Sequence, residues 1–374
     1  MRLSNSLGAP TTELAPSPSK PMAEHKINMT VADTLNSFRA VYKIVDGHPI
    51  DAKIYLPNPR EGKRIFPICK CQPWPEVVDV NLLTLIVINI HGGAFMLGSY
   101  DMVNKDQIRD CLSRSWIVVV PNHRLCPQVN LLEGPITDCR DLLAWIHSGG
   151  LDEAISSHTN DTGYQYRLDL NHVFAFGTSS GGTLALTLGF DVPHPVEGIL
   201  DFYGPCDFAD PFWTQEIPSL TAMLPTNLSD DFLQQVYHEK VVPIEGGVSL
   251  EGQAPGLPNF EDPRQAFAWS CIARGQVLKT VYPCGEWEKV DPIRNVSSSF
   301  PPTFIIHGAE DKMVLVELSR RLYTVLRDHG VQCEMREIPG EGHTFAARMK
   351  VGSSTWEMQR EGFDFLEQLA KRAS

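Results

Sequence analysis

Apolar and polar residues alternate near the start of the chain, and later segments are apolar on both faces. Segments 40–45 and 50–55 flank a turn-forming Asp-Gly-His-Pro sequence, and the second segment alternates, so an antiparallel hairpin is predicted here. Segment 82–90 is almost entirely apolar, as expected of a strand in the middle of a sheet. The hairpin is therefore predicted to open the sheet to which 82–90 belongs.

Strand-like and helix-like segments alternate through much of the remaining chain. Five further short segments are predicted to be strands: 117–120, 173–176, 199–200, 303–306 and 334–338. Segments 136–146 and 313–329 carry apolar residues at helical spacing, and Gly330 is a suitable residue to end the second helix. This alternation predicts an α/β fold with a mostly parallel central sheet and right-handed crossovers.

The alternation stops between about residues 207 and 299. This segment contains many prolines and aromatic residues, helix-like stretches at 230–238 and 263–274, and no clear strand. We interpret it as a cap inserted over the upper edge of the sheet, where an aromatic cover would exclude water and select an apolar substrate. The alternative is a long structural loop packed against the side of the core.

Residues 1–29 are rich in proline, serine and threonine and are predicted to be a flexible tail. The chain is 43% hydrophobic over 374 residues, which is enough for one large α/β domain at 30–374 that contains the cap. The tail has no continuous apolar stretch, so we expect neither a signal peptide nor a stable membrane insertion.

Charge and cysteine content narrow the function classes. The net charge is −13, from 45 acidic and 32 basic residues, so nucleic acid and anionic membrane surfaces are poor partners. The nine cysteines have no repeated spacing, and Cys69 and Cys71 lack a second pair at zinc-ligand distance. We therefore expect reduced thiols, no metal site and a cytoplasmic location.

An apolar strand and a helical segment are joined by the sequence Gly177-Thr178-Ser179-Ser180-Gly181. Gly-x-Ser-x-Gly at such a turn is typical of a nucleophile elbow, because Gly177 and Gly181 allow a strained backbone to pass close to its neighbours. Ser179 is the candidate nucleophile, and the backbone N–H of Ser180 is free to bind an oxyanion. A glycine-rich turn without function would also produce this motif, so further residues are needed to decide.

A second glycine motif, His91-Gly92-Gly93-Ala94, directly follows the most apolar predicted strand. Small residues at this position let backbone N–H groups point into the crevice above the carboxyl end of the strand. Gly92, Gly93 and Ala94 are therefore candidates for an oxyanion hole beside Ser179. We interpret His91 as a residue that holds this loop rather than as a base.

A carboxylate and a histidine follow the last two predicted strands. Asp311 is assigned to orient the histidine, with Glu310 as its competitor and a helix N-cap as the structural alternative. His343, in a glycine-rich loop, is assigned as the general base, whereas His307 is interpreted as a strand-end residue. The chain order Ser179, Asp311, His343 is the order found in enzymes with a nucleophile elbow.

These motifs together carry a family resemblance. His-Gly-Gly at 91–93, Gly-x-Ser-x-Gly at 177–181, His-Gly-x-x-Asp at 307–311 and Gly-His-x-Phe at 342–345 resemble the hormone-sensitive-lipase-type branch of the α/β-hydrolase superfamily. The resemblance extends over roughly residues 40–370 and implies an α/β-hydrolase fold, a mostly parallel sheet flanked by helices, with a cap. Ala94 stands where the family usually has a third glycine, but its N–H is retained, so the oxyanion hole should survive.

The predicted function is a serine hydrolase that cleaves esters or thioesters of small to medium apolar acyl groups through an acyl-enzyme. It needs no cofactor. One alternative is an acyl-transfer or thioesterase enzyme of secondary metabolism, which releases or lactonises a chain held by an acyl-carrier partner. A second alternative is a non-catalytic ligand receptor on the same fold. An exposed apolar edge would allow a homodimer, although no sequence feature demonstrates one.

Overall fold

The computed structural model describes residues 35–58, 84–160, 166–247 and 258–373. The predicted tail at 1–29, the cysteines at 69 and 71, and the first two residues of segment 82–90 lie outside the described residues.

The described strands form one sheet of eight, in the order β1-β2-β4-β3-β5-β6-β7-β8. Their bounds are β1 Ser37–Val45, β2 His48–Tyr55, β3 Thr84–Ile90, β4 Ile117–Pro121, β5 Leu168–Thr178, β6 Gly198–Phe202, β7 Thr303–Gly308 and β8 Cys333–Ile338. β1 and β2 form the predicted hairpin, and β2 is also antiparallel to β4. All the other neighbours are parallel, so the prediction of a mostly parallel α/β sheet is confirmed.

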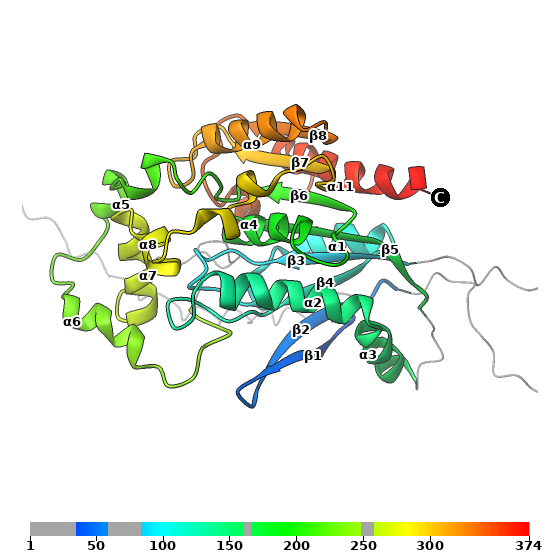
Figure 1. The fold of residues 1–374 in the computed structure, drawn as a ribbon, viewed down its shortest axis with the longest axis horizontal. Helices are drawn as coiled ribbons and strands as arrows, with labels where there is room; N and C mark the ends of the chain where they lie inside the picture. Colours follow the sequence, from blue (N-terminus) through cyan, green and yellow to red (C-terminus); the bar gives the residue numbers. More distant parts are fainter. Residues whose placement is uncertain (1–34, 59–83, 161–165, 248–257, 374) are drawn as a thin grey trace, which may run out of the picture. The chain divides into compact units, whose positions relative to one another are not determined.

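Helices cover both faces of this sheet (Figure 1). The first face carries α2 Thr137–His147, α3 Gly150–Thr159, α4 Ser180–Leu186 and α9 Val316–Asp328, whose apolar side chains join one buried cluster. The second face carries α1 Lys105–Ser113 and α11 Ser354–Ala373, whose apolar side chains join another. The central strands are buried on both sides because each cluster takes alternate residues from the same strands.

Two predicted helices begin or end slightly differently from the sequence prediction. A π-helical turn, Leu132–Ile136, leads into α2, because Pro135 lacks the N–H that a regular helix would use at this position. The predicted helix 313–329 begins at Val316, since residues 311–314 form a turn around the side chain of Asp311. It ends as expected before Gly330, which has φ +75°.

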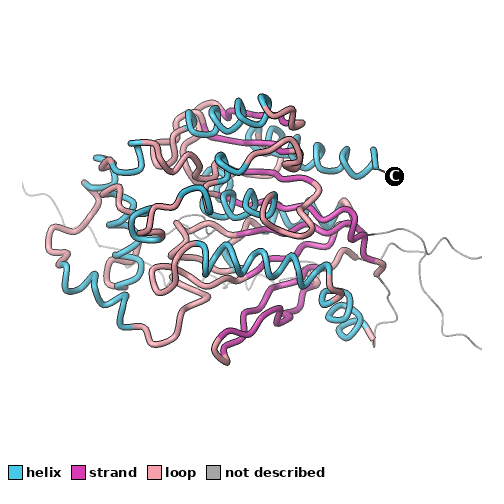
Figure 2. Tube along the Cα trace, viewed as in Figure 1, coloured by secondary structure: helices cyan, strands magenta, loops and turns pink. Residues whose placement is uncertain are grey.

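The described part of the segment between β6 and β7 contains α-helices as well as short 3₁₀ helices (Figure 1). The α-helices are α5 Pro218–Thr221, α6 Asp230–Leu233, α7 Pro263–Ala273 and α8 Val277–Val281, and we call residues 207–299 the cap. They lie at the end of the sheet toward which the parallel strands point. Figure 2 shows only helix and loop in the described part of this segment, as predicted, apart from one isolated β-bridge between Gly98 and Gly246. The described part of 207–299 thus lies at the carboxyl ends of the strands, where the candidate residues lie.

In the part of the chain that the structure describes, no helix is long and apolar enough to cross a membrane.

Candidate active site

Ser179 lies at a sharp turn between the end of β5 and the start of α4. Its backbone has φ +51° and ψ −124°. L-residues rarely adopt this conformation, and residues that do are found mainly at functional sites. The Ser179 N–H donates to the carbonyl of Phe202 (2.9 Å), and the Ser179 carbonyl accepts from Gly182 (2.8 Å) at the start of the helix. These bonds hold the strained residue between the sheet and α4.

The two motif glycines are required by close backbone contacts rather than by unusual torsion angles. A Cβ atom on Gly181 would lie 2.1 Å from the carbonyl oxygen of Ile90, and one on Gly177 would lie 2.2 Å from the carbonyl oxygen of Gly181. Both distances are far below a van der Waals contact, so only glycine fits at either position. The expected reason for these two residues therefore agrees with the geometry of the turn.

Ser179, His343 and Asp311 form a continuous hydrogen-bonded chain. The Nε2 atom of His343 lies 2.9 Å from Oγ of Ser179, and its Nδ1 atom lies 2.6 Å from Oδ2 of Asp311. All three side chains are buried, with Ser179 and His343 reaching solvent at only 8% and 9% of their surface. The fold thus brings together three residues that are 32 and 164 positions apart in sequence.

Both oxygens of the Asp311 carboxylate accept hydrogen bonds. Oδ1 accepts from the backbone N–H groups of Met313 (2.8 Å) and Val314 (3.0 Å). These bonds close a turn before α9, but Asp311 is not the N-cap of that helix, because the N-cap residue is Leu315. Burial would raise the pKa of this carboxyl, but the adjacent His343 and His307 outweigh burial and hold the pKa well below its usual range. Asp311 is therefore ionised throughout the neutral pH range. The competing carboxylate, Glu310, is exposed to solvent.

Tyr203 packs against His343. Its ring centre lies 4.8 Å from that of His343, in an edge-to-face arrangement, and 6.2 Å from that of His307. Tyr203 directly follows β6 and has φ +45°. The active site therefore contains a second residue, besides Ser179, with a strained backbone. No local sequence pattern predicts this contact, because it joins residues from separate loops.

The predicted oxyanion loop forms a tight turn next to Ser179. The carbonyl of Gly93 accepts hydrogen bonds from Met96 (3.0 Å) and Leu97 (2.9 Å), and Ala94 and Phe95 both have positive φ, 54° and 64°. Gly93 and Ala94 line the same pocket as Ser179 and His343. Ser180 begins α4 directly after Ser179, and Gly92 precedes the turn.

His91 is buried beneath this loop, in agreement with its interpretation as a loop-holding residue. Its Nδ1 donates to the carbonyl of Gly92 (2.8 Å), and its ring stacks on His123 with the ring centres 4.5 Å apart. Burial, followed by the nearby His123, lowers the pKa of His91 to about 3. His91 is therefore neutral at physiological pH, and its hydrogen bond goes to the loop backbone.

The pocket beside Ser179 has a volume of about 50 Å³ for the centres of water-sized molecules, within about 530 Å³ of empty space that includes the open solvent at its mouth. Apolar residues of both the core and the cap line it: Phe95, Pro205, Met313 and Val314 from the core, and Trp213, Ile272, Val277 and Leu278 from the cap. Among the described lining residues, only His343 has a titratable side chain. The indole N–H of Trp213 donates to the carbonyls of Cys206 and Asp207, which fixes the orientation of this wall.

Within the described residues, no group of three or more His, Cys, Asp or Glu side chains is arranged to hold a metal ion.

Comparison with protein families gives two adjacent matches. Residues 78–239 match the model described as BD-FAE, and residues 276–372 match the model of the prolyl oligopeptidase family. Together with the mostly parallel sheet flanked by helices, these matches define the fold as that of an α/β-hydrolase.

The curated relatives are much longer proteins. The chain is 29% identical over 364 residues to the non-reducing polyketide synthase trt4 of Aspergillus terreus, with 88% of this chain and 14% of the relative covered. It is 26% identical over 328 residues to the non-reducing polyketide synthase prhL of Penicillium brasilianum, with 78% and 13% covered. The chain thus spans only about a seventh of the length of these relatives.

Solved structures share the fold at low sequence identity. A protein of unknown function from Staphylococcus aureus has a TM-score of 0.61 at 18% identity, with 89% of this chain and 99% of that chain covered. Esterase 2 of Thermogutta terrifontis, in a form phosphoramylated by tabun, has a TM-score of 0.53 at 15% identity, with 91% and 98% covered. At these identities the likeness concerns the α/β-hydrolase fold alone.

Proposed function

We propose that this protein is a serine hydrolase that cleaves carboxylic esters or thioesters through an acyl-enzyme on Ser179. The observation that carries the proposal is the continuous chain of hydrogen bonds from Oγ of Ser179 through His343 to Asp311. An apolar pocket opens directly onto the same oxygen. A buried nucleophile, base and orienting carboxylate in this geometry are the requirements of acyl transfer.

In the first half of the reaction, Oγ of Ser179 attacks the carbonyl carbon while Nε2 of His343 removes the hydroxyl proton. The carbonyl π electrons move to the oxygen, and their return expels the alcohol or thiol, which takes the proton from His343. In the second half, water attacks the acyl carbon and gives a proton to His343. The second tetrahedral intermediate then collapses, the bond between the acyl carbon and Oγ of Ser179 breaks, the carboxylic acid leaves, and Oγ takes the proton back from His343. Asp311 stays ionised and stabilises the imidazolium in both halves.

The negative oxygen of each tetrahedral intermediate is proposed to be bound by backbone N–H groups. The candidates are those of Gly92, Gly93, Ala94 and Ser180, and the positions of Gly93 and Ala94 at the pocket wall support them. Loss of one such donor raises the barrier by about 3 kcal/mol in serine hydrolases. Ala94 has a positive φ, so its backbone is strained, and such strain is common where a loop has a functional role such as binding an oxyanion.

The motifs favour the hormone-sensitive-lipase-type branch within the α/β-hydrolases, and the lining favours small to medium apolar acyl groups. Trp213, Ile272 and Leu278 would bind the acyl chain from the cap side. A charged acyl group would lose its hydration there without a charged partner among the described lining residues. We also propose that the protein is located in the cytoplasm.

A second candidate function is release of an acyl chain from a carrier protein as a thioester. The specific observation in its favour is that the matched relatives are named polyketide synthases, and this chain spans 13–14% of them. The same acyl-enzyme would form, but water or a hydroxyl of the acyl chain itself would resolve it, giving an acid or a lactone.

The experiment that tests the proposal measures hydrolysis of p-nitrophenyl esters from acetyl to dodecanoyl, alongside the matching N-acetylcysteamine thioesters. We expect turnover of short and medium chains, with a cut-off set by the pocket. Preference for thioesters, or a lactone among the products of a hydroxyacyl thioester, would favour the second candidate. Tight binding of these compounds without turnover would instead indicate a ligand receptor.

A further inference from the structure

Arg264 is an almost fully buried arginine in the first turn of α7, with 5% of its surface exposed. Its guanidinium has five N–H groups, and hydrogen bonds account for all five. Nη1 donates to the backbone carbonyls of Met96 (2.9 Å) and Cys126 (2.8 Å). Nε and Nη2 donate to the carboxylate of Glu239, and Nη2 also donates to Oε1 of Gln128 (2.6 Å).

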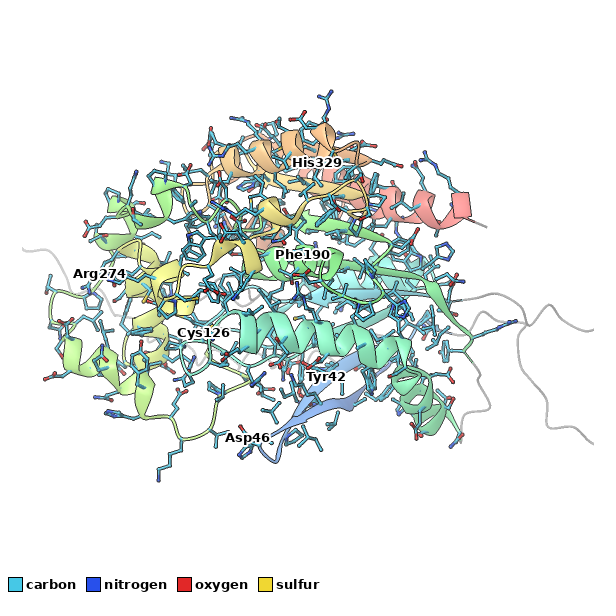
Figure 3. All side chains as sticks on the ribbon, viewed as in Figure 1. Tyr42, Asp46, Cys126, Phe190, Arg274 and His329 are labelled. Carbon is cyan, nitrogen blue, oxygen red and sulfur yellow. The ribbon has the colours of Figure 1, made fainter. Side chains whose placement is uncertain are left out.

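These bonds connect the cap to two loops of the core. Glu239 and Arg264 belong to the cap, whereas Met96 and Cys126 lie in the loops that follow β3 and β4. Figure 3 labels Cys126 on the core side and Arg274 near the far end of α7 on the cap side. A buried charge is stable only when it is paired and hydrogen-bonded, so the geometry of this contact is closely defined.

Met96 lies in the tight turn of residues 93–97, which contains the oxyanion candidates Gly93 and Ala94. The turn holds two consecutive non-glycine residues, Ala94 and Phe95, in the left-handed region. Such a conformation persists only when neighbouring groups fix it. The carbonyl of Phe95 accepts from the N–H of Cys126 (2.9 Å), and the next carbonyl, that of Met96, accepts from Arg264.

A second link between the cap and this loop runs beside the first. The backbone groups of Gly98 and Gly246 exchange two hydrogen bonds, of 2.8 and 3.1 Å. The N–H of Leu125 donates to the carbonyl of Pro243 (2.8 Å). The oxyanion turn is therefore fixed from the cap side, and Arg264 supplies a link to the turn itself that is made by a charged side chain.

We propose that Arg264 is a positioning residue that holds the 93–97 turn in the conformation that aims its backbone N–H groups at the oxyanion. The inference rests on the proposed function and adds that the cap supports the chemistry as well as lining the pocket. Arg264 does not line the pocket and so acts through the turn. Its loss should weaken binding of the transition state and leave binding of the uncharged substrate nearly unchanged.

The test compares the wild type with Arg264→Met on a p-nitrophenyl ester that the wild type cleaves. We expect kcat to fall by about 10- to 100-fold with KM changed by less than about 2-fold, because a small misplacement of positioned groups has effects of this size. Affinity for a trifluoromethyl ketone, which forms a tetrahedral oxyanion on the serine, should fall by the same factor. Affinity for the matching secondary alcohol and the pH dependence of kcat should not change, since Ser179, His343 and Asp311 are untouched.

Two further variants make the result decisive. Arg274→Met removes a half-buried arginine at the C-terminal end of the same helix and should leave all five quantities as in the wild type. Arg264→Lys retains the charge beside Glu239 but cannot make both carbonyl contacts, so an intermediate loss of kcat is expected. This variant tests the inference if Arg264→Met does not fold.

Retention of full activity by a folded Arg264 variant, or a loss of kcat without a matching loss of ketone affinity, would overturn the inference. A wild type that neither cleaves esters nor binds the ketone would overturn the proposed function itself, and this inference with it.

Discussion

His307 lies next to Asp311, beside the same carboxylate oxygen that is hydrogen-bonded to His343. Nε2 of His307 lies 3.2 Å from Oδ2 of Asp311, and the same oxygen lies 2.6 Å from Nδ1 of His343. Nε2 of His307 also faces the carbonyl of Val314 at 2.8 Å, so both of its neighbours are acceptors and it must carry the hydrogen. Nδ1 of His307 accepts from the hydroxyl of Ser319 at 2.7 Å. Oδ2 of Asp311 thus lies between the two imidazoles: it is hydrogen-bonded to His343 and within ion-pair distance of His307, whose N–H is directed at the carbonyl of Val314.

Replacement of His307 should reduce both stability and turnover. His307→Phe would leave the hydroxyl of Ser319 and the carbonyl of Val314 buried without this partner, at a cost of about 1–3 kcal/mol in the free energy of unfolding. Asp311 would lose a neighbouring imidazole that helps to hold its pKa low, so kcat should fall by roughly 10-fold. Urea denaturation and ester kinetics measure the two effects, and His307→Gln should recover part of each. Unchanged kcat in a destabilised His307→Phe protein would mean that the contact is only structural.

Asp311, and not Glu310, should be essential for turnover. Asp311→Asn keeps the acceptor for Met313 and Val314 but no longer fixes the His343 tautomer, so kcat should fall by about 10⁴-fold, as in other serine triads. Glu310→Gln is the matched control, because Glu310 is exposed and adjacent, and should be close to the wild type. Equal losses in the two variants would contradict the assignment.

Asp201 should make stability depend on pH. This carboxyl of β6 is fully buried, and its Oδ2 has no hydrogen-bond partner among the described residues; burial raises its pKa from 3.8 to about 7. The folded state therefore keeps a proton that the unfolded state has lost, so stability falls as pH rises from about 4 to 7 and is level above that range. The total effect is on the order of 4 kcal/mol.

Urea denaturation of the wild type and Asp201→Asn at several pH values isolates this effect, since other titrating groups contribute equally to both proteins. The difference in unfolding free energy should shift in favour of Asp201→Asn as pH rises through this window. Parallel curves for the two proteins would show that Asp201 ionises normally in the folded state.

The elbow should tolerate no side chain at Gly181. Gly181→Ala would place a Cβ atom 2.1 Å from the carbonyl oxygen of Ile90, which the backbone of β3 cannot avoid without moving Ser179. We expect a loss of folded protein, or of at least about 100-fold in kcat in any that folds. Gly342→Ala is the control, because its Cβ would meet nothing closer than 3.8 Å. Similar yield and activity in both variants would argue against the strained turn.

The sequence predicted those parts of the fold that depend on local pattern. The hairpin at β1 and β2, the alternating strands and helices, and the turn at Ser179 all follow from residues that are close in the chain. The 20-residue helix α11 was not predicted, although Trp356, Phe363 and Leu366 recur on one of its faces at helical spacing. The motif residues Ser179, Asp311 and His343 also came from local signals, each at the end of a predicted strand.

The contacts that support these residues could not be predicted, because they join distant segments. His307 was interpreted as a strand-end residue, which it is, but its contact with Asp311 depends on the turn between them. Arg264 lies 168 positions from Met96 and 138 from Cys126, and one arginine in an irregular cap has no distinguishing pattern. Tyr203 directly follows β6 and His343 lies in the loop after β8, so their contact joins segments that follow two strands separated by β7 in the sheet.

The position of the acyl group during turnover tests the proposed mechanism most directly. The protein is mixed with p-nitrophenyl butyrate, quenched in acid within the first turnovers, digested and mapped by mass spectrometry, with Ser179→Ala treated in parallel. We expect a butyryl group on Ser179 in the wild type, together with a burst of nitrophenol, and neither in Ser179→Ala. Acylation of another residue such as Ser180, or equal nitrophenol release by folded Ser179→Ala, would contradict the assignment of Ser179 as the nucleophile.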